Sequence, residues 1–219
     1  MLLYRTYLTN PAAQAVFIFL LVTCASGVKP DRSSGIVSLE SDLDGDGQTE
    51  RIRLDKDSDP SLSIRHGKRL MWRGVPAKWK PWKLAVADVD GDGRLDIIVG
   101  VYKSTRYFPK PHNCLFIYAW DGRRAHPKWL GSSLGRPFVD FAFVDSNNDG
   151  QEELLAIEIK RDGKRCLAAY SWNGFGFTLD WQRGDWQEVR LIEATGNRII
   201  VEADGSRITL TGDEMRSRS

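Results

Sequence analysis

Four carboxylates lie within nine residues of the sequence DVDGDGRLD, which runs from Asp88 to Asp96. Counted from Asp88, acidic side chains occupy positions 1, 3, 5 and 9, and glycines occupy positions 4 and 6. Like charges this close repel one another unless a proton or a cation neutralises them. Glycine permits the positive φ angles of a tight turn, and a loop of hard oxygen ligands suits Ca²⁺. The pattern therefore predicts a calcium loop, with the backbone carbonyl of Arg94 at position 7 as a further ligand.

The same pattern occurs three times, which makes self-similarity the most informative property of the chain. DLDGDGQTE begins at Asp42 and DSNNDGQEE begins at Asp145. Each copy has oxygen-bearing side chains at positions 1, 3, 5 and 9 and a glycine at position 6. We call them the first, second and third acidic loops. The third has three carboxylates and Asn147, so we expect it to bind calcium most weakly.

Strand-like sequences flank every acidic loop. The runs IVSLE, KLAVA and FVDFAFV precede the three loops, and RIRL, IIVG and LLAIEI follow them. Aromatic runs then lead into the turn pairs of IYAWDG and AYSWNG, and a tryptophan lies near the end of each unit. Each unit is therefore predicted to be strand, acidic loop, strand, hairpin, strand, turn and strand. Four short strands in a unit of this length are typical of a β-propeller blade.

A degenerate fourth unit begins at Trp186, and its loop, EATGN, lacks the ligand pattern. This unit is one strand short, and the segment from Ser33 to Leu39 is a candidate to complete it from the other end of the chain. We predict an all-β fold over residues 28–215: a β-propeller of about four blades, with three clear repeats and one degenerate repeat. The sequence leaves open whether the blades close or form an open or atypical ring. Residues 216–219 are expected to be a C-terminal tail.

The pattern D-x-D-G-D-G-x-x-D/E between two strands resembles the FG-GAP/VCBS repeats of integrin-α-like β-propellers, over roughly residues 36–184. The resemblance implies that two or three structural Ca²⁺ ions each tie two strands of a blade together. It implies side-chain ligands at Asp42, Asp44, Asp46, Glu50, Asp88, Asp90, Asp92, Asp96, Asp145, Asn147, Asp149 and Glu153. It also implies backbone carbonyl ligands at Gln48, Arg94 and Gln151. Members commonly have more blades than this chain has room for, and the family serves adhesion, ligand binding and scaffolding alike.

Residues 1–27 are expected to be a signal peptide rather than part of the fold. Arg5 is the only charged residue there, the run from Ala15 to Ala25 is apolar, and Ala25-Ser26-Gly27 suits cleavage. The alternative is a lipoprotein signal, LVTC, in which Cys24 carries a lipid anchor. We therefore expect an exported protein that is extracellular, periplasmic or attached to the cell envelope, with no transmembrane span in the mature chain.

Two other interpretations of the motifs fit less well. An EF-hand needs a glutamate at position 12 and flanking helices, whereas position 12 here is Arg53, Val99 or Ala156. The sequence GSSLG nominates Ser133 as a nucleophile, but all three histidines precede it, against the order of a hydrolase triad on this motif. We expect no catalysis. The tripeptide RGD at residues 183–185 is interpreted as structural.

Basic residues dominate the chain outside the acidic loops. The net charge is +2, although eleven of the 29 acidic residues are at the ligand positions of those loops. One basic-aromatic stretch, RGVPAKWKPWK, offers Arg73, Lys78, Trp79, Lys80, Trp82 and Lys83, and a second runs from Tyr102 to Asn113. Tryptophan beside lysine or arginine suits sugar rings, anionic glycans or a membrane interface. The alternative is that both tryptophans pack in the core.

These observations predict an exported, calcium-binding, non-catalytic module for binding or scaffolding. Its partner is expected to be a protein, an anionic glycan or another ligand of the cell envelope, and not a nucleic acid. The alternative is an extracellular enzyme that acts on carbohydrate or lipid, or the accessory module of one.

Overall fold

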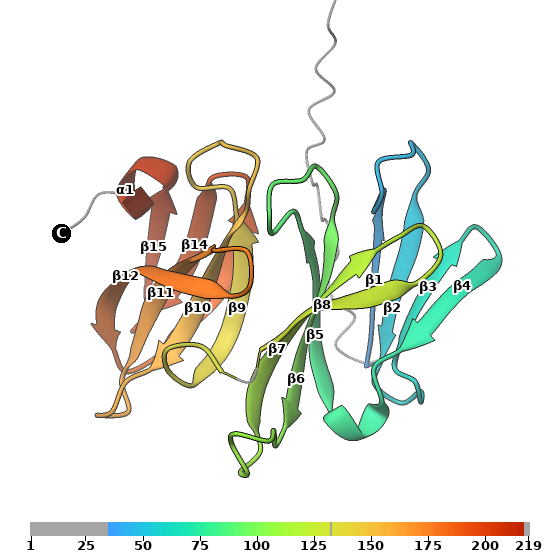
Figure 1. Cartoon of the computed structure of the whole chain (residues 1–219). Helices are drawn as coiled ribbons and strands as arrows, with labels where there is room; N and C mark the ends of the chain where they lie inside the picture. The colour runs from blue at the N-terminus through green and yellow to red at the C-terminus, as the bar shows by residue number, and fades with distance from the viewer. Residues whose placement is uncertain (1–34, 132, 217–219) are drawn as a thin grey trace, which may run out of the picture.

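Four antiparallel sheets follow one another along the chain in the computed structural model, which describes residues 35–131 and 133–216 (Figure 1). The predicted signal peptide lies outside these residues. The first sheet contains β1 (Ile36–Ser41), β2 (Glu50–Asp55), β3 (Leu62–His66) and β4 (Arg69–Gly74). The second contains β5 (Pro81–Ala87), β6 (Asp96–Lys103), β7 (His112–Trp120) and β8 (Ala125–Gly131). The third contains β9 (Phe138–Val144), β10 (Glu153–Ile159), β11 (Arg165–Trp172) and β12 (Phe177–Trp186). The fourth has three strands, β13 (Val189–Thr195), β14 (Arg198–Ala203) and β15 (Ser206–Thr211).

Each sheet is a simple meander, in which every strand pairs with its neighbours in sequence. The predicted all-β propeller of four blades is therefore confirmed, as is the missing strand of the fourth blade. The idea that the segment from Ser33 to Leu39 completes that blade is wrong, because β1 pairs with β2 in the first blade. The acidic loop joins these two strands directly, and closing a short loop costs less chain entropy than closing across the whole chain.

The hydrophobic cores lie between consecutive blades. Ile52 and Leu54 of β2 face the second blade, where Val99 and Phe116 meet them. Strand β6 is buried on both faces, so that Val99 lies in the first core and the adjacent Ile98 lies in the second. A strand buried on both sides is an almost continuous apolar run, and the sequence IIVGV fits this position. A third core joins the third and fourth blades.

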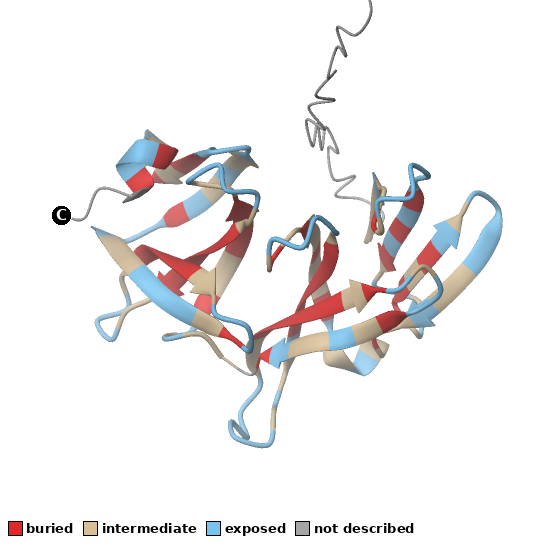
Figure 2. Cartoon of the chain, turned by 45° about the horizontal axis from the view of Figure 1, so that its top comes forward, coloured by how far each residue is buried: buried red, intermediate tan, exposed pale blue. Residues whose placement is uncertain are grey.

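No core among the described residues joins the fourth blade to the first, so the blades form an open arc (Figure 2). The outward face of the fourth blade is polar and carries the ion pairs Arg190–Glu202 (2.9 Å) and Arg198–Glu193 (2.7 Å). The outward face of the first blade also carries exposed charged residues on β2, β3 and β4. Polar outer faces are what the terminal units of a repeat array require for solubility.

Two short helices accompany the sheets. The 3₁₀ turn η1 (Ala77–Trp79) connects the first two blades, and α1 (Gly212–Arg216) ends the described chain. Helix α1 begins with a capping box, since the backbone N–H and hydroxyl of Thr211 both donate to the Glu214 carboxylate at 2.8 and 3.0 Å. Its Met215 is buried in the third core. No helix in the described part of the chain is long and apolar enough to cross a membrane.

Candidate metal centres and ligand surface

All three acidic loops adopt one local conformation. The carboxylate at position 1 accepts hydrogen bonds from the backbone N–H groups of the turn that follows it: Asp42 from Gly45, Asp46 and Gly47, Asp88 from Gly91, Asp92 and Gly93, and Asp145 from Asp149 and Gly150. The N–H at position 7 donates to the carboxylate at position 5 in each loop, from Gln48, Arg94 and Gln151. Positions 4 and 6 have positive φ throughout, with Asn148 in place of a glycine in the third loop.

The first loop gathers three carboxylates around one point. Asp42, Asp44 and Glu50 each offer an oxygen, and these oxygens lie within 4.8 Å of one another. Glu50 is buried, and it accepts a hydrogen bond from the N–H of Leu43 at 3.1 Å. The Oδ1 atom of Asp44 is buried and has no hydrogen-bond partner. A buried carboxylate oxygen without a donor is unfavourable, and a hard divalent cation at this point satisfies it. The donor set therefore fits Ca²⁺.

The second loop contains a cation from the protein itself. Asp88, Asp90 and Asp92 form its cluster of oxygens, and Oδ1 of Asp90 is buried without a partner. However, the Lys128 ammonium on β8 lies 2.6 Å from Asp90 and 2.7 Å from Asp96. Burial raises the pKa of Asp96 to about 6, although the lysine opposes the rise. The first two loops have the same number of carboxylates in the sequence. In the structure, however, Lys128 neutralises part of the negative charge of the second loop.

In the third loop, hydrogen bonds from the loop itself occupy the position-9 carboxylate. Glu153 accepts hydrogen bonds from the N–H and hydroxyl of Ser146 at 2.8 and 2.6 Å, and the Asn147 amide donates to Asp149 and Glu153. Burial also raises the pKa of Glu153. Three clustered carboxylate oxygens are found in the first and second loops but not in this one, within the part of the chain that the structure describes.

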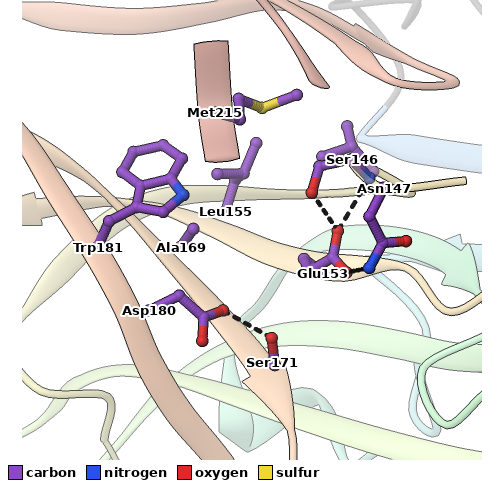
Figure 3. Close-up of a pocket in the computed structure, with 10 residues that line it drawn as sticks. Ser146, Asn147, Glu153, Leu155, Ala169, Ser171, Asp180, Trp181 and Met215 are labelled. Atoms are coloured by element: carbon purple, nitrogen blue, oxygen red, sulfur yellow. Dashed lines mark hydrogen bonds between the residues drawn. The ribbon is translucent and has the colours of Figure 1, made fainter. Parts of the chain in front are cut away.

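A cavity of about 220 Å³ lies beside the third loop, and Figure 3 shows Glu153 at one side of it with Trp181 and Met215 opposite. Outside the acidic loops, the only carboxylate among the described lining residues is Asp180, which accepts a hydrogen bond from Ser171 at 2.6 Å. Both carboxylates that line the cavity, Glu153 and Asp180, thus accept hydrogen bonds from neighbouring residues.

The three loops lie side by side along one rim of the arc, which we call the acidic rim. The N–H of Leu95, at position 8 of the second loop, donates to the carbonyl of Leu43 in the first loop at 3.1 Å. Glu152, at position 8 of the third loop, donates its N–H to the Asp88 carbonyl and accepts from the Asp88 N–H, both at 2.8 Å. Burial raises the pKa of Glu152 to about 7. Position 8 thus links each loop to the one before it.

Residues 42–99 match the family model of the FG-GAP-like repeat. They contain the first two acidic loops and the strands from β2 through the first part of β6. The chain therefore contains an FG-GAP-like repeat. A search of curated proteins finds no match to it. The third repeat has the same loop conformation and the same four-stranded sheet as the matched region.

The two tryptophans of the predicted ligand surface pack into different cores of the propeller. Trp79 meets Phe116 edge-on at 5.3 Å between ring centroids, in the first core. Trp82 meets Phe141 edge-on at 5.5 Å, in the second core. Both indoles are half-buried. The two rings therefore do not form one exposed aromatic face. This outcome agrees with the alternative given from the sequence, in which both tryptophans pack in the core.

The four cations of that stretch are also divided. Lys83 is half-buried, and its ammonium lies 2.5 Å from Asp140 and 2.6 Å from the carbonyl of Phe141 in the third blade. Arg73 lies on the outward face of the first blade. Only Lys78 and Lys80 stay exposed beside η1.

Lys78 and Lys80 belong to a wider basic surface, which we call the basic rim. It contains the exposed or half-exposed residues Lys78, Lys80, Tyr102, Lys103, Arg106, Tyr107, Phe108 and Lys110. The Lys80 ammonium lies 5.9 Å from the centre of the Tyr102 ring, and Lys103 lies 5.2 Å from the centre of the Trp79 ring. The acidic loop between β5 and β6 and the excursion between β6 and β7 leave opposite ends of β6. The acidic and basic rims are therefore at opposite ends of the blades (Figure 1).

The remaining motifs have structural roles. The RGD tripeptide lies inside β12, and Asp185 is ion-paired with Lys160 and Lys164 of the β10–β11 turn. Hydrogen bonds from these lysines lower the pKa of Asp185. Ser133 lies in the connection between two strands, β8 and β9, rather than at a strand-to-helix elbow.

Proposed function

We propose that this protein is an exported, calcium-stabilised module for binding or scaffolding, without catalytic activity of its own. The FG-GAP propeller fold suggests a binding or scaffold module. The observation that carries the calcium proposal is the first acidic loop, where three carboxylates converge and one buried Asp44 oxygen has no donor. The second loop also has three clustered carboxylates, Asp88, Asp90 and Asp92, between two strands.

In this proposal, calcium stabilises the acidic rim. An ion in the first loop joins Asp42, where β1 ends, to Glu50, where β2 begins, and so holds the two strands together. The backbone carbonyls of Gln48, Arg94 and Gln151 supply further oxygens. Two or three ions bind per chain, most weakly in the third loop. Weak calcium sites with a Kd of about 10⁻⁴–10⁻³ M are typical of extracellular modules, which agrees with export.

The partner contacts the basic rim. Lys78, Lys80, Arg106 and Lys110 form no ion pair with the described residues, and Tyr107 is 77% exposed at the tip of the excursion. Free cations beside exposed aromatic rings suit an anionic glycan or an acidic protein surface. Each calcium ion at the opposite rim would add two positive charges to a chain whose net charge is already +2, and would make the molecule more basic.

The test is thermal unfolding of the full chain in calcium and in chelator, with bound metal counted by mass spectrometry. Each site filled at ten times its Kd is expected to add about 1.4 kcal/mol, or about 3–6 °C in Tm. Asp44→Ala should remove one calcium and part of the rise. The control, Asp57→Ala, changes an exposed carboxylate of the β2–β3 connection, at the opposite end of β2. An equal Tm in both conditions, with no bound metal, would overturn the calcium proposal.

A further inference from the structure

We propose that the outward face of the first blade is a binding site for a tetrahedral oxyanion, either a phosphate ester or a sulfate ester. A groove of about 250 Å³ crosses this face. Its polar lining residues include Arg53, Arg65, Arg73 and Ser63, together with one acidic residue, Asp55. The groove belongs to neither the acidic rim nor the basic rim, and the inference does not depend on calcium binding.

The sheet register fixes the positions of the three arginines and Ser63. Arg53 of β2 pairs with Ser63 of β3, and Ser63 pairs with Arg73 of β4, so the two arginines flank the serine in one row. Arg65 is two residues further along β3, on the same face, and is therefore diagonal to both. Diagonal neighbours in an antiparallel sheet are about 7–8 Å apart. Arginine side chains are long enough to reach across that distance and bind the same small anion.

Two of the three guanidinium groups have no counter-charge. Arg53 pairs with Asp55 at 3.0 Å. Arg65 and Arg73 donate only to backbone carbonyls, those of Lys68 at 3.1 Å and Pro60 at 3.3 Å, and neither forms an ion pair with the described residues. The groove therefore presents uncompensated positive charge that an anion would neutralise.

A fourth arginine, Arg51, lies next to Arg65 and makes the positive charge on this face unfavourable unless an anion binds. Arg51 is directly opposite Arg65 in the register, and like charges in that arrangement are destabilising. Arg51 is neutralised by Glu40 at 2.6 Å, which leaves Arg65 as the member of the pair without a partner. By contrast, Arg190 and Arg198 on the outward face of the fourth blade are both paired with glutamates. The outward face of the first blade therefore differs from that of the fourth in grouping two arginines without counter-charges, Arg65 and Arg73, in one groove.

The donor set favours a tetrahedral group over a carboxylate. Each guanidinium presents a planar fork that binds two oxygens of phosphate or sulfate. A tetrahedral oxyanion has enough oxygens to face the forks of Arg65 and Arg73 together and to accept from the Ser63 hydroxyl. A carboxylate has two oxygens, and a single guanidinium group can bind both of them.

The experiment is calorimetric titration of the full chain at low salt with inorganic sulfate, glucose 6-phosphate and heparin. Saturable binding is expected for at least one of them. Arg65→Gln and Arg73→Gln should each raise the Kd of sulfate or glucose 6-phosphate at least tenfold, and the double variant should abolish their binding. For heparin, which the basic rim is also proposed to bind, the double variant should remove one class of sites. Arg65→Lys, which keeps the charge but loses the fork, should give an intermediate Kd. The matched control is Arg207→Gln on β15, an exposed arginine that forms no ion pair with the described residues, and it should change Kd less than twofold.

The probes also separate the two sources of the oxyanion. Binding of glucose 6-phosphate without heparin assigns the groove to a phosphate ester. Binding of heparin that Arg65→Gln weakens, without binding of glucose 6-phosphate, assigns it to a sulfated glycan. The proposal is overturned if no probe binds saturably, or if Arg207→Gln weakens binding as much as Arg65→Gln. It is also overturned if poly-L-glutamate competes as well as the tetrahedral probes do. The substituted side chains lie at the surface, so an unchanged Tm confirms that each variant is folded.

Discussion

A single side chain from a distant strand distinguishes two acidic loops that have almost the same sequence. Lys128 of β8 lies within hydrogen-bonding distance of Asp90 and Asp96 in the second loop. The equivalent residue of the third blade, which also precedes the tryptophan of its last strand, is Asp180. The lysine and a calcium ion would both bind the carboxylates at positions 3 and 9, so the two cations compete for them. At the residue scale, the calcium affinity of a loop therefore depends on a strand that the loop motif does not include.

Replacing this lysine should raise calcium affinity and lower stability without calcium. Lys128→Met leaves Asp90 and the buried Asp96 without their counter-ion, and removing one partner of a buried pair costs about 3 kcal/mol. In chelator we expect a lower Tm than wild type. In calcium the loss should be recovered, because the second loop now has four uncompensated carboxylates. Thermal unfolding with and without calcium measures both effects.

The control for this variant is Lys164→Met, which removes an exposed lysine from its ion pair with Asp185, away from the acidic loops. It should leave the calcium-dependent rise in Tm at its wild-type value. If Lys128→Met also shows the wild-type rise, the lysine does not compete with calcium.

At the scale of elements, the connection between β8 and β9 is attached to the third blade by buried polar groups. The hydroxyl of Tyr170 donates to Glu158 and accepts from the N–H of Gly135 at 3.1 Å. Glu158 is fully buried and also accepts from the Arg136 N–H and from the Gln182 amide at 2.6 Å. Burial and Glu158 raise the pKa of Tyr170 well above its ordinary value, so the hydroxyl keeps its proton. The second and third blades are therefore joined by a connection with fixed geometry.

Tyr170→Phe should destabilise the protein by about 1–3 kcal/mol, because a buried carboxylate and a backbone N–H each lose a partner. The shift in the urea midpoint measures this loss. Tyr107→Phe removes the hydroxyl of a tyrosine that is 77% exposed, and it should change stability by less than about 0.5 kcal/mol. Equal midpoints for the two variants would show that the buried network does not anchor the connection.

Local pattern predicted the elements of the fold well. The alternation of β2, the turn glycines and the position-1 aspartates are all short-range features, and each acidic loop has the strand before it and the strand after it that were expected. The capping box of α1 was missed although its signal, Thr211 followed by Glu214, is present in the sequence. A helix of five residues has no apolar periodicity to reveal it.

Contacts between blades were not predictable, because they join residues far apart in the chain. Glu152 meets Asp88 across 64 positions, and nothing in either loop motif indicates the bond. The outcome for Trp79 and Trp82 has a related cause. Trp79 precedes β5 and packs in the first core, whereas Trp82 is the second residue of β5 and packs in the second core. A basic-aromatic stretch looks the same in sequence whether its rings are exposed or packed.

The whole molecule behaves as a short linear array, because each blade packs only on its neighbours in sequence among the described residues. The two middle blades each contribute to two cores, and the terminal blades contribute to one. In such an array the stability of a unit depends on its own strands and on its nearest interfaces. We therefore expect local opening to begin at the ends of the arc, and most readily in the three-stranded fourth blade.

Hydrogen exchange measured by mass spectrometry tests this expectation over the full chain. Peptides from β6, β7, β10 and β11 should be the most protected, and those from β13 to β15 should exchange at least about tenfold faster, because their opening breaks one interface instead of two. Calcium should slow exchange most in β1 and β2, which the first acidic loop joins directly. The control is the same comparison in Met215→Ala, which removes a side chain that α1 buries in the third core and should speed exchange in the fourth blade before the second. Equal protection in all four blades would mean instead that the arc opens as one cooperative unit and that its ends are held by contacts beyond the three cores.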